Sequence, residues 1–180
     1  MQKTAYIAYG VIEGPLHGWR TRKSLKKRSY AISSRVENTD LIVAHSGGHL
    51  LLPALRSNQT LLAIDPTCHN GRAPAYNFML HALLDIRTVL FSRYACFYVY
   101  KTLCNIIYLL AQPARTMVMY RAYFKSDQQA LFRRERTIVV QGMDRSWFAA
   151  DVLRSTHVHY LQTTHDDCWL HPDRYLDYVC

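Results

Sequence analysis

The sequence predicts an α/β fold, in which a mostly parallel sheet carries helices on both of its faces. Short apolar runs typical of buried strands alternate along the chain with segments that have helical spacing. Three chemically useful side chains also come just after predicted strands, where the loops of an open α/β sheet converge. At 180 residues the chain is long enough to bury a core, so we expect a single domain over residues 1–180.

The predicted elements follow one another in a strand and helix order. Between Tyr30 and Thr39 there is room for one short strand and no full strand–helix unit, so we expect a trimmed sheet of about five or six strands. In chain order the elements are a strand at Ala5 to Tyr9, a basic helix at Gly18 to Arg28, a short edge strand near Tyr30 to Ser33, a strand at Leu41 to His45, a helix at Gly48 to Arg56, a strand at Thr60 to Ile64, a helical insert at about residues 72–135, a strand from Arg136 that ends at Gly142, a helix at Trp147 to Ser155, and a strand at His157 to Gln162.

The most informative motif is the segment Ala44 to Gly48, which follows an apolar run and precedes helix-like leucines. Ser46 has small residues two positions away on each side, as in the G-x-S-x-G turn that presents a serine nucleophile, with Ala44 in place of the first glycine. Such a turn exposes the Ser46 hydroxyl and aims the N–H of Gly47 at an oxyanion. An ordinary strand–Gly–Gly–helix connection would have the same pattern.

Two later segments each deliver a polar side chain after a strand. Asp144 comes two residues after the glycine that ends the strand beginning at Arg136, and His165 follows the strand that ends at Gln162. The chain order is therefore serine, acid, histidine, with all three residues at the carboxyl ends of predicted strands. Parallel strands bring those ends to one edge of the sheet.

On these segments the chain resembles the α/β-hydrolase family, particularly its small single-domain serine hydrolases. The resemblance implies that Ser46 is the nucleophile, that His165 is the general base and then the acid, and that Asp144 orients the imidazole. It implies cleavage of a carboxylic ester or a related acyl bond through an acyl-enzyme, with no cofactor. The matching segments are Leu41 to Pro53, Leu61 to Pro66, Ile138 to Asp144, Val158 to His165 and, more weakly, Tyr6 to Gly10.

Other residues compete for two of these roles. Asp166 and Asp167 directly follow the histidine, and His171 comes six residues later. We favour Asp144 and His165, because one loop seldom supplies both an imidazole and its buried carboxylate partner.

The second oxyanion donor is expected in the loop after the first strand. The backbone N–H of Gly10 or Val11 would complete the hole there. Trp19, in the helix that follows, is expected to pack against the sheet. The alternative function is that of a catalytically degenerate relative acting as a binding or interaction protein, which the trimmed sheet and Ala44 favour.

The helical insert at about residues 72–135 is rich in aromatic residues. It is either a cap over the site or a set of ordinary helices covering the sheet. Arg87, Arg93 and Lys101 interrupt its apolar run, so we expect no transmembrane segment, and peripheral contact with lipid stays open.

The chain carries a formal net charge of +9 and has basic clusters at Arg20 to Arg28 and Arg133 to Arg136. Neither cluster belongs to a recognised nucleic-acid module, so we expect an apolar or anionic small-molecule substrate and no nucleic acid. Five cysteines without a C-x-x-C pair argue against a disulfide framework, and no metal-ligand spacing or targeting signal is present. The cytoplasm is the simplest expected compartment.

Overall fold

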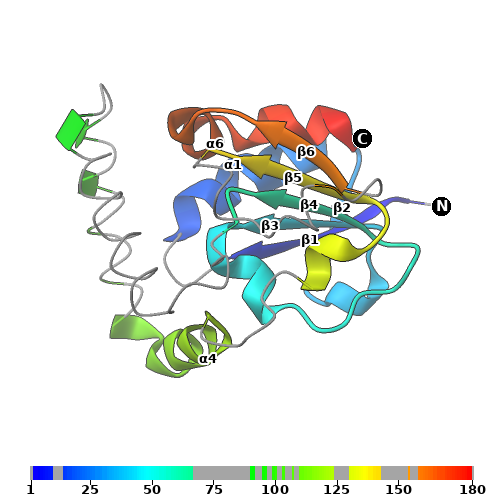
Figure 1. Cartoon of the computed structure of the whole chain (residues 1–180), viewed down its shortest axis with the longest axis horizontal. Coiled ribbons are helices and arrows are strands. Elements are labelled where there is room, and N and C mark those ends of the chain that lie inside the picture. The colour runs from blue at the N-terminus through cyan, green and yellow to red at the C-terminus, as the bar shows by residue number, and fades with distance from the viewer. Residues whose placement is uncertain are drawn as a thin grey trace.

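The fold was analysed in a computed structural model of the chain. The structure describes residues 2–9, 14–66, 110–123, 130–142 and 158–179, together with single helical positions between 90 and 107 and at 154. Six strands form one sheet, every neighbouring pair is parallel, and the order is β2-β1-β3-β4-β5-β6 (Figure 1). This sheet confirms the predicted α/β class and strand number. The strands are β1 (Thr4–Tyr9), β2 (Ala31–Ile32), β3 (Leu41–His45), β4 (Thr60–Ile64), β5 (Thr137–Gln141) and β6 (Val158–Gln162).

The central strands are buried along their whole length because both faces of the sheet are covered. All five residues of β3 and all five of β5 are buried, as expected for strands inside a parallel sheet. The register places Ile7, Val43, Leu62 and Ile138 in one row across four strands. This row belongs to the core on one face of the sheet. The alternate residues of the same strands form a second core on the other face.

Helix α1 (Gly14–Lys27) begins four residues earlier than predicted. Its inner side is formed by Gly18, Thr21 and Leu25, which are buried and spaced three and four residues apart. Trp19 lies about 120° around the helix from Leu25 at 100° per residue, and it is 59% exposed. The prediction that Trp19 packs against the sheet is therefore wrong. Its ring lies 5.2 Å from the Lys23 ammonium instead.

The helix predicted at Gly48 to Arg56 is also wrong in type and length. The structure has a 3₁₀ helix, η3 (Ser46–Leu51), followed by extended backbone at Leu52 with φ −78° and ψ 138°. Leu52 precedes Pro53, whose ring disfavours helical backbone in the residue before it and which has no N–H to donate. The proline therefore ends the helix after six residues.

The remaining helical segments lie around the sheet. Among the described residues none forms a helix long and apolar enough to span a bilayer. The predicted helix at Trp147 to Ser155 lies outside the described residues apart from Arg154, which is helical. The remaining helical segments are η2 (Val36–Asn38), α4 (Pro113–Tyr123), η4 (Ala130–Arg133), α6 (His165–Leu170) and η6 (Pro172–Tyr178).

Candidate functional site

All six strands end at the same edge of the sheet because they run in the same direction, and Figure 1 shows α4 beyond this edge. The chain segments that leave these ends carry most of the residues singled out from the sequence. The residues at this edge are Tyr9 at the end of β1, Ser46 and Gly47 after β3, Asp65 after β4, Gly142 after β5, and Thr163 to His165 after β6.

The turn after β3 has the tight packing that the serine motif predicts. Ser46 directly follows the last residue of β3 and opens η3, while Gly47 and Gly48 are buried. A Cβ atom on Gly48 would overlap the backbone carbonyl of Ala8 in β1. Glycine is required because η3 passes this close to the neighbouring strand. The N–H of Gly47 lies in the first turn of η3, where backbone donors have no partner within the helix.

His45, immediately before the serine, is buried and has a structural role. Its Nε2 atom lies 3.0 Å from the Thr21 hydroxyl of α1, and its ring is stacked against Tyr9 at 6.0 Å between centroids. Burial lowers the pKa of His45 to about 4. The imidazole is therefore neutral at physiological pH and links the end of β3 to α1. Sequence analysis gave this histidine no role.

Asp65 is a buried carboxylate at the end of β4 that sequence analysis missed. Its Oδ1 atom accepts hydrogen bonds from the Gln141 side chain at 3.2 Å and from the Gly142 backbone N–H at 3.1 Å. Asp65 has φ 47°, a left-handed conformation that aspartate tolerates better than most residues. The carboxylate thus fixes the start of the loop that leads to Asp144. The sequence signal that could have identified Asp65 is an acidic residue directly after a predicted strand.

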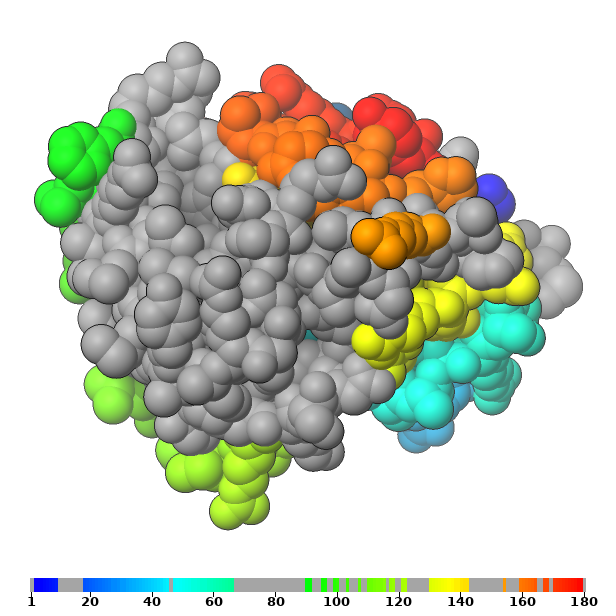
Figure 2. All heavy atoms as spheres, in the orientation of Figure 1, coloured from blue at the N-terminus to red at the C-terminus, as the bar shows by residue number. Residues whose placement is uncertain are grey.

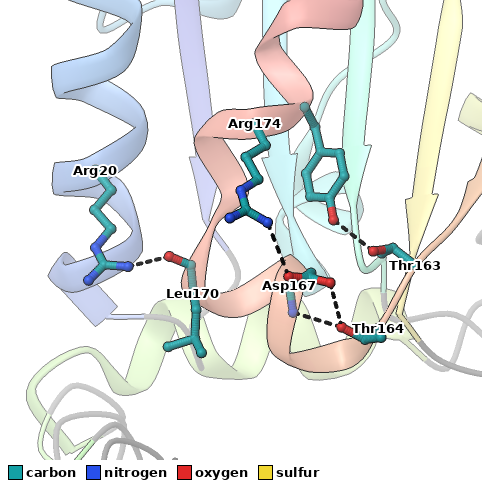
Figure 3. Close-up of polar contacts among 7 residues, drawn as sticks. Arg20, Thr163, Thr164, Asp167, Leu170 and Arg174 are labelled. Atoms are coloured by element: carbon teal, nitrogen blue, oxygen red, sulfur yellow. Dashed lines mark hydrogen bonds and ion pairs between the residues drawn. The ribbon is translucent and has the colours of Figure 1, made fainter.

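The segment after β6 is held by hydrogen bonds on both sides (Figure 3). Thr164 caps α6, because its hydroxyl accepts a hydrogen bond from the Asp167 backbone N–H at 3.1 Å. The same hydroxyl donates to the Asp167 carboxylate at 2.8 Å, and the other carboxylate oxygen pairs with Arg174 at 3.4 Å. The Thr163 and Tyr175 hydroxyls are 2.9 Å apart.

These contacts give two of the rival residues structural roles. The carboxylate of Asp167 is used in the cap of α6 and in the pair with Arg174, so Asp167 stabilises the helix. His171 is half-buried and ends α6, with its backbone N–H bonded to the Asp167 carbonyl. The sequence Thr164-x-x-Asp167 is a capping pattern that could have predicted the helix. His165 is the first residue of α6, whereas sequence analysis expected it in a loop.

A basic residue of α1 joins this region to the rest of the fold. Arg20 donates a hydrogen bond to the Leu170 carbonyl at the end of α6 (Figure 3). Burial raises the pKa of Tyr175, so its hydroxyl stays neutral beside Thr163. The segment that carries His165 is therefore fixed both to α1 and to η6.

The predicted site residues can be placed to different extents. The backbones of Ser46, Gly47 and His165 lie at the carboxyl edge of the sheet. Asp144, Gly10 and Val11 lie outside the described residues, as do the side chains of Ser46 and His165.

No group of three histidine, cysteine or acidic residues that could hold a metal ion occurs within the part of the chain that the structure describes. The thiol of Cys96 is exposed and that of Cys168 is buried. The edge of the sheet therefore offers a serine turn, backbone donors and a buried carboxylate.

Comparison with solved structures gives a relative of the same fold. The structure is similar to the crystal structure of a probable hydrolytic enzyme from Pseudomonas aeruginosa PAO1, with a TM-score of 0.56 and 12% sequence identity. The match covers 98% of this chain and 84% of the other. The two proteins share a fold. No known family model and no curated protein sequence matches the chain.

Proposed function

We propose that this protein is a serine hydrolase of the α/β-hydrolase type, cleaving a carboxylic ester or a related acyl bond through an acyl-enzyme on Ser46. The main support is the turn after β3, where Ser46 leaves a central strand and Gly48 packs directly against the backbone of β1. The shared fold with a protein named as a probable hydrolytic enzyme agrees with this proposal. Family membership is part of the proposal.

The proposed reaction needs a base, an orienting acid and an oxyanion hole. His165 would take the Ser46 proton as the hydroxyl oxygen attacks the carbonyl carbon, and would then pass that proton to the leaving alkoxide. Water would then attack the acyl-enzyme with the same proton transfers through His165, which releases the carboxylic acid product and free Ser46. The N–H of Gly47, with that of Gly10 or Val11, would stabilise the negative oxygen of each tetrahedral intermediate.

The topology sets a geometric condition on this reaction. β4 and β5 lie between β3 and β6, so the ends of β3 and β6 are about 14 Å apart at roughly 4.8 Å per strand. Thr163 and Thr164 must therefore carry the chain back across β5 for the imidazole to reach Ser46. The bonds that hold this segment against α1 and η6 keep it in one arrangement.

The orienting carboxylate is assigned to Asp144, with Asp65 in a supporting role. Asp65 already accepts two hydrogen bonds from the end of β5, one of them from Gly142, two residues before Asp144. It therefore acts on the loop and not directly on the imidazole. Asp65 is accordingly a positioning residue.

The alternative, a degenerate binding protein, rested partly on Ala44. Ala44 lies within β3 and pairs with Ala8 and Ala63, where the backbone is extended. A residue in such backbone needs no glycine-like positive φ. Alanine at this position therefore gives no reason to infer a disabled turn.

The test is covalent labelling by a fluorophosphonate together with turnover of short p-nitrophenyl esters. Ser46→Ala should abolish labelling, and Ser46→Ala and His165→Ala should each lower turnover by about 10³-fold or more. The matched controls are Ser34→Ala and His159→Ala, which change exposed residues of the same types away from the carboxyl edge. Wild-type protein that neither labels nor turns over any ester would overturn the proposal.

The two carboxylates are separated by their asparagine variants. Asp144→Asn should reduce kcat by about 10²–10⁴-fold, because the imidazole loses its charged partner. Asp65→Asn should reduce it far less, since an amide oxygen still accepts from Gly142. The opposite ranking would make Asp65 the orienting acid and Asp144 dispensable.

A further inference from the structure

Exposed large apolar side chains are concentrated in one stretch of the chain. Of the eleven such residues among those described, nine lie between residues 90 and 118. Soluble proteins scatter such residues singly over the surface, whereas a contiguous group marks a surface that contacts something. The nine are Leu90, Phe91, Val99, Tyr100, Leu103, Ile107, Leu110, Met117 and Val118.

Four of these nine residues have the spacing of one face of a helix. Residues 96, 99, 103, 107 and 110 are helical and exposed, and they are separated by three or four positions. Residues so spaced lie one above another along a helix. The exposed fraction is 48% at Val99, 67% at Ile107 and 78% at Leu110. We call the exposed residues Cys96, Val99, Leu103, Ile107 and Leu110 the apolar stripe.

The apolar stripe lies at the outside of the molecule and away from the sheet. Figure 1 shows the described part of the stretch between residues 90 and 110 (green) beyond the carboxyl ends of the strands, and Figure 2 shows residues of the same stretch (green) at the outline of the molecule. The stripe therefore lies on the same side of the molecule as the edge that carries Ser46.

The charge of this stretch is of one sign. Between Asp85 and Asp127 the sequence holds no acidic residue and six basic ones, which are Arg87, Arg93, Lys101, Arg115, Arg121 and Lys125. Two copies of the stripe facing each other would bring these like charges together, which disfavours self-association. An apolar helix face in a purely basic segment is instead the pattern of helices that lie in the interface of anionic membranes.

We propose that the apolar stripe binds the surface of an anionic phospholipid bilayer. The helix would lie in the plane of the interface with the stripe among the outer acyl carbons, while the basic side chains contact lipid phosphates. This orientation would turn the carboxyl edge of the sheet toward the lipid. The proposal is independent of the hydrolase proposal, because it concerns binding and needs no turnover.

Vesicle sedimentation with purified full-length protein tests this binding. Wild-type protein should sediment with vesicles containing phosphatidylglycerol and bind pure phosphatidylcholine vesicles at least about tenfold more weakly, with added salt reducing the difference. The double variant Leu103→Glu/Ile107→Glu should lose about tenfold or more in affinity, because acidic side chains cannot enter the acyl region. Circular dichroism establishes that the variant is folded.

The matched control adds the same charge elsewhere. Among the described residues outside the stretch, Trp19 and Tyr178 are the two exposed large apolar ones, each 59% exposed, and Trp19→Glu/Tyr178→Glu should keep nearly all of the vesicle affinity. Equal losses in the two double variants would overturn the assignment to the stripe. Wild-type protein that fails to bind phosphatidylglycerol vesicles, or light scattering that shows a dimer which the stripe variant makes monomeric, would also overturn the proposal.

Discussion

The sheet and the helical stretch at residues 90–123 use similar apolar side chains in opposite ways. Leu62 in β4 is completely buried between two strands, whereas Leu103 in the apolar stripe is 56% exposed. Burial of such a side chain contributes about 1.5–3 kcal/mol to folding. The sheet residues therefore hold the fold together, whereas exposed stripe residues contribute little and are available to a partner.

The largest expected difference is in the free energy of unfolding when the same leucine-to-alanine substitution is made in each region. Leu62→Ala should lower the free energy of unfolding by about 2–5 kcal/mol, because it leaves a cavity in the core that covers one face of the sheet. Leu103→Ala should change it by no more than about 0.5 kcal/mol, because its side chain is largely in water already. Urea denaturation followed by circular dichroism measures both values.

A large loss at Leu103 would break the comparison. It would mean that the stripe is covered within the folded chain, and the membrane proposal would lose its main argument. A small loss at Leu62 would mean that the sheet core can collapse around the cavity.

The second prediction concerns the buried histidine at the end of β3. His45 has a pKa of about 4 in the folded protein and about 6.5 when unfolded. As the pH falls below 6.5 the unfolded chain binds the proton first, so this residue lowers stability between pH 6.5 and 4 and adds no further loss below that. The maximum loss is about 3 kcal/mol.

The measurement is the free energy of unfolding at several pH values in wild-type protein and in His45→Gln. Glutamine can still bond the Thr21 hydroxyl but does not titrate, so its curve should be flatter across this window. Carboxylates titrate equally in both proteins, and their effect cancels in the difference. Parallel curves would show that His45 is not buried as described.

The smallest effect is expected where the two regions meet. Arg115 of α4 donates a hydrogen bond to the Tyr9 carbonyl at 3.0 Å, at the carboxyl end of β1. Arg115→Met should cost about 1–2 kcal/mol, toward the lower end of the range for a hydrogen bond from a charged donor, because Arg115 is only half-buried. It should also speed hydrogen exchange in α4.

Arg121→Met serves as the control, because Arg121 is exposed on the same helix. It should leave both stability and exchange unchanged within error. If exchange in α4 is insensitive to Arg115, the helix is held by its packing on η3 alone.

The strands were the most predictable part of the molecule. β3 and β4 have the predicted limits, and β1 and β5 lie within a residue or so of theirs. Buried parallel strands are continuous apolar runs, so their signal is local and strong. The position of the serine turn followed directly from the end of β3.

Features that depend on tertiary contacts or on single residues were harder to predict. The helix after Ser46 is shorter than predicted because Pro53 disfavours helical backbone at Leu52. The roles of His45 and Asp65 could not be read locally, because their partners are Thr21 and Gly142, 24 and 77 positions away. Burial of a polar side chain depends on packing that sequence spacing does not reveal.

The pairing of β4 with β5 has a consequence for how this protein can change. These strands are direct neighbours, yet 72 residues separate Ile64 from Thr137. Asp65 and the buried Phe132 belong to the framework, but lengthening, shortening or exchanging residues between Pro66 and Ala130 need not alter any strand order or register. The framework can therefore keep its architecture while the inserted module is replaced, which gives evolution and protein engineering a natural place to graft new surfaces.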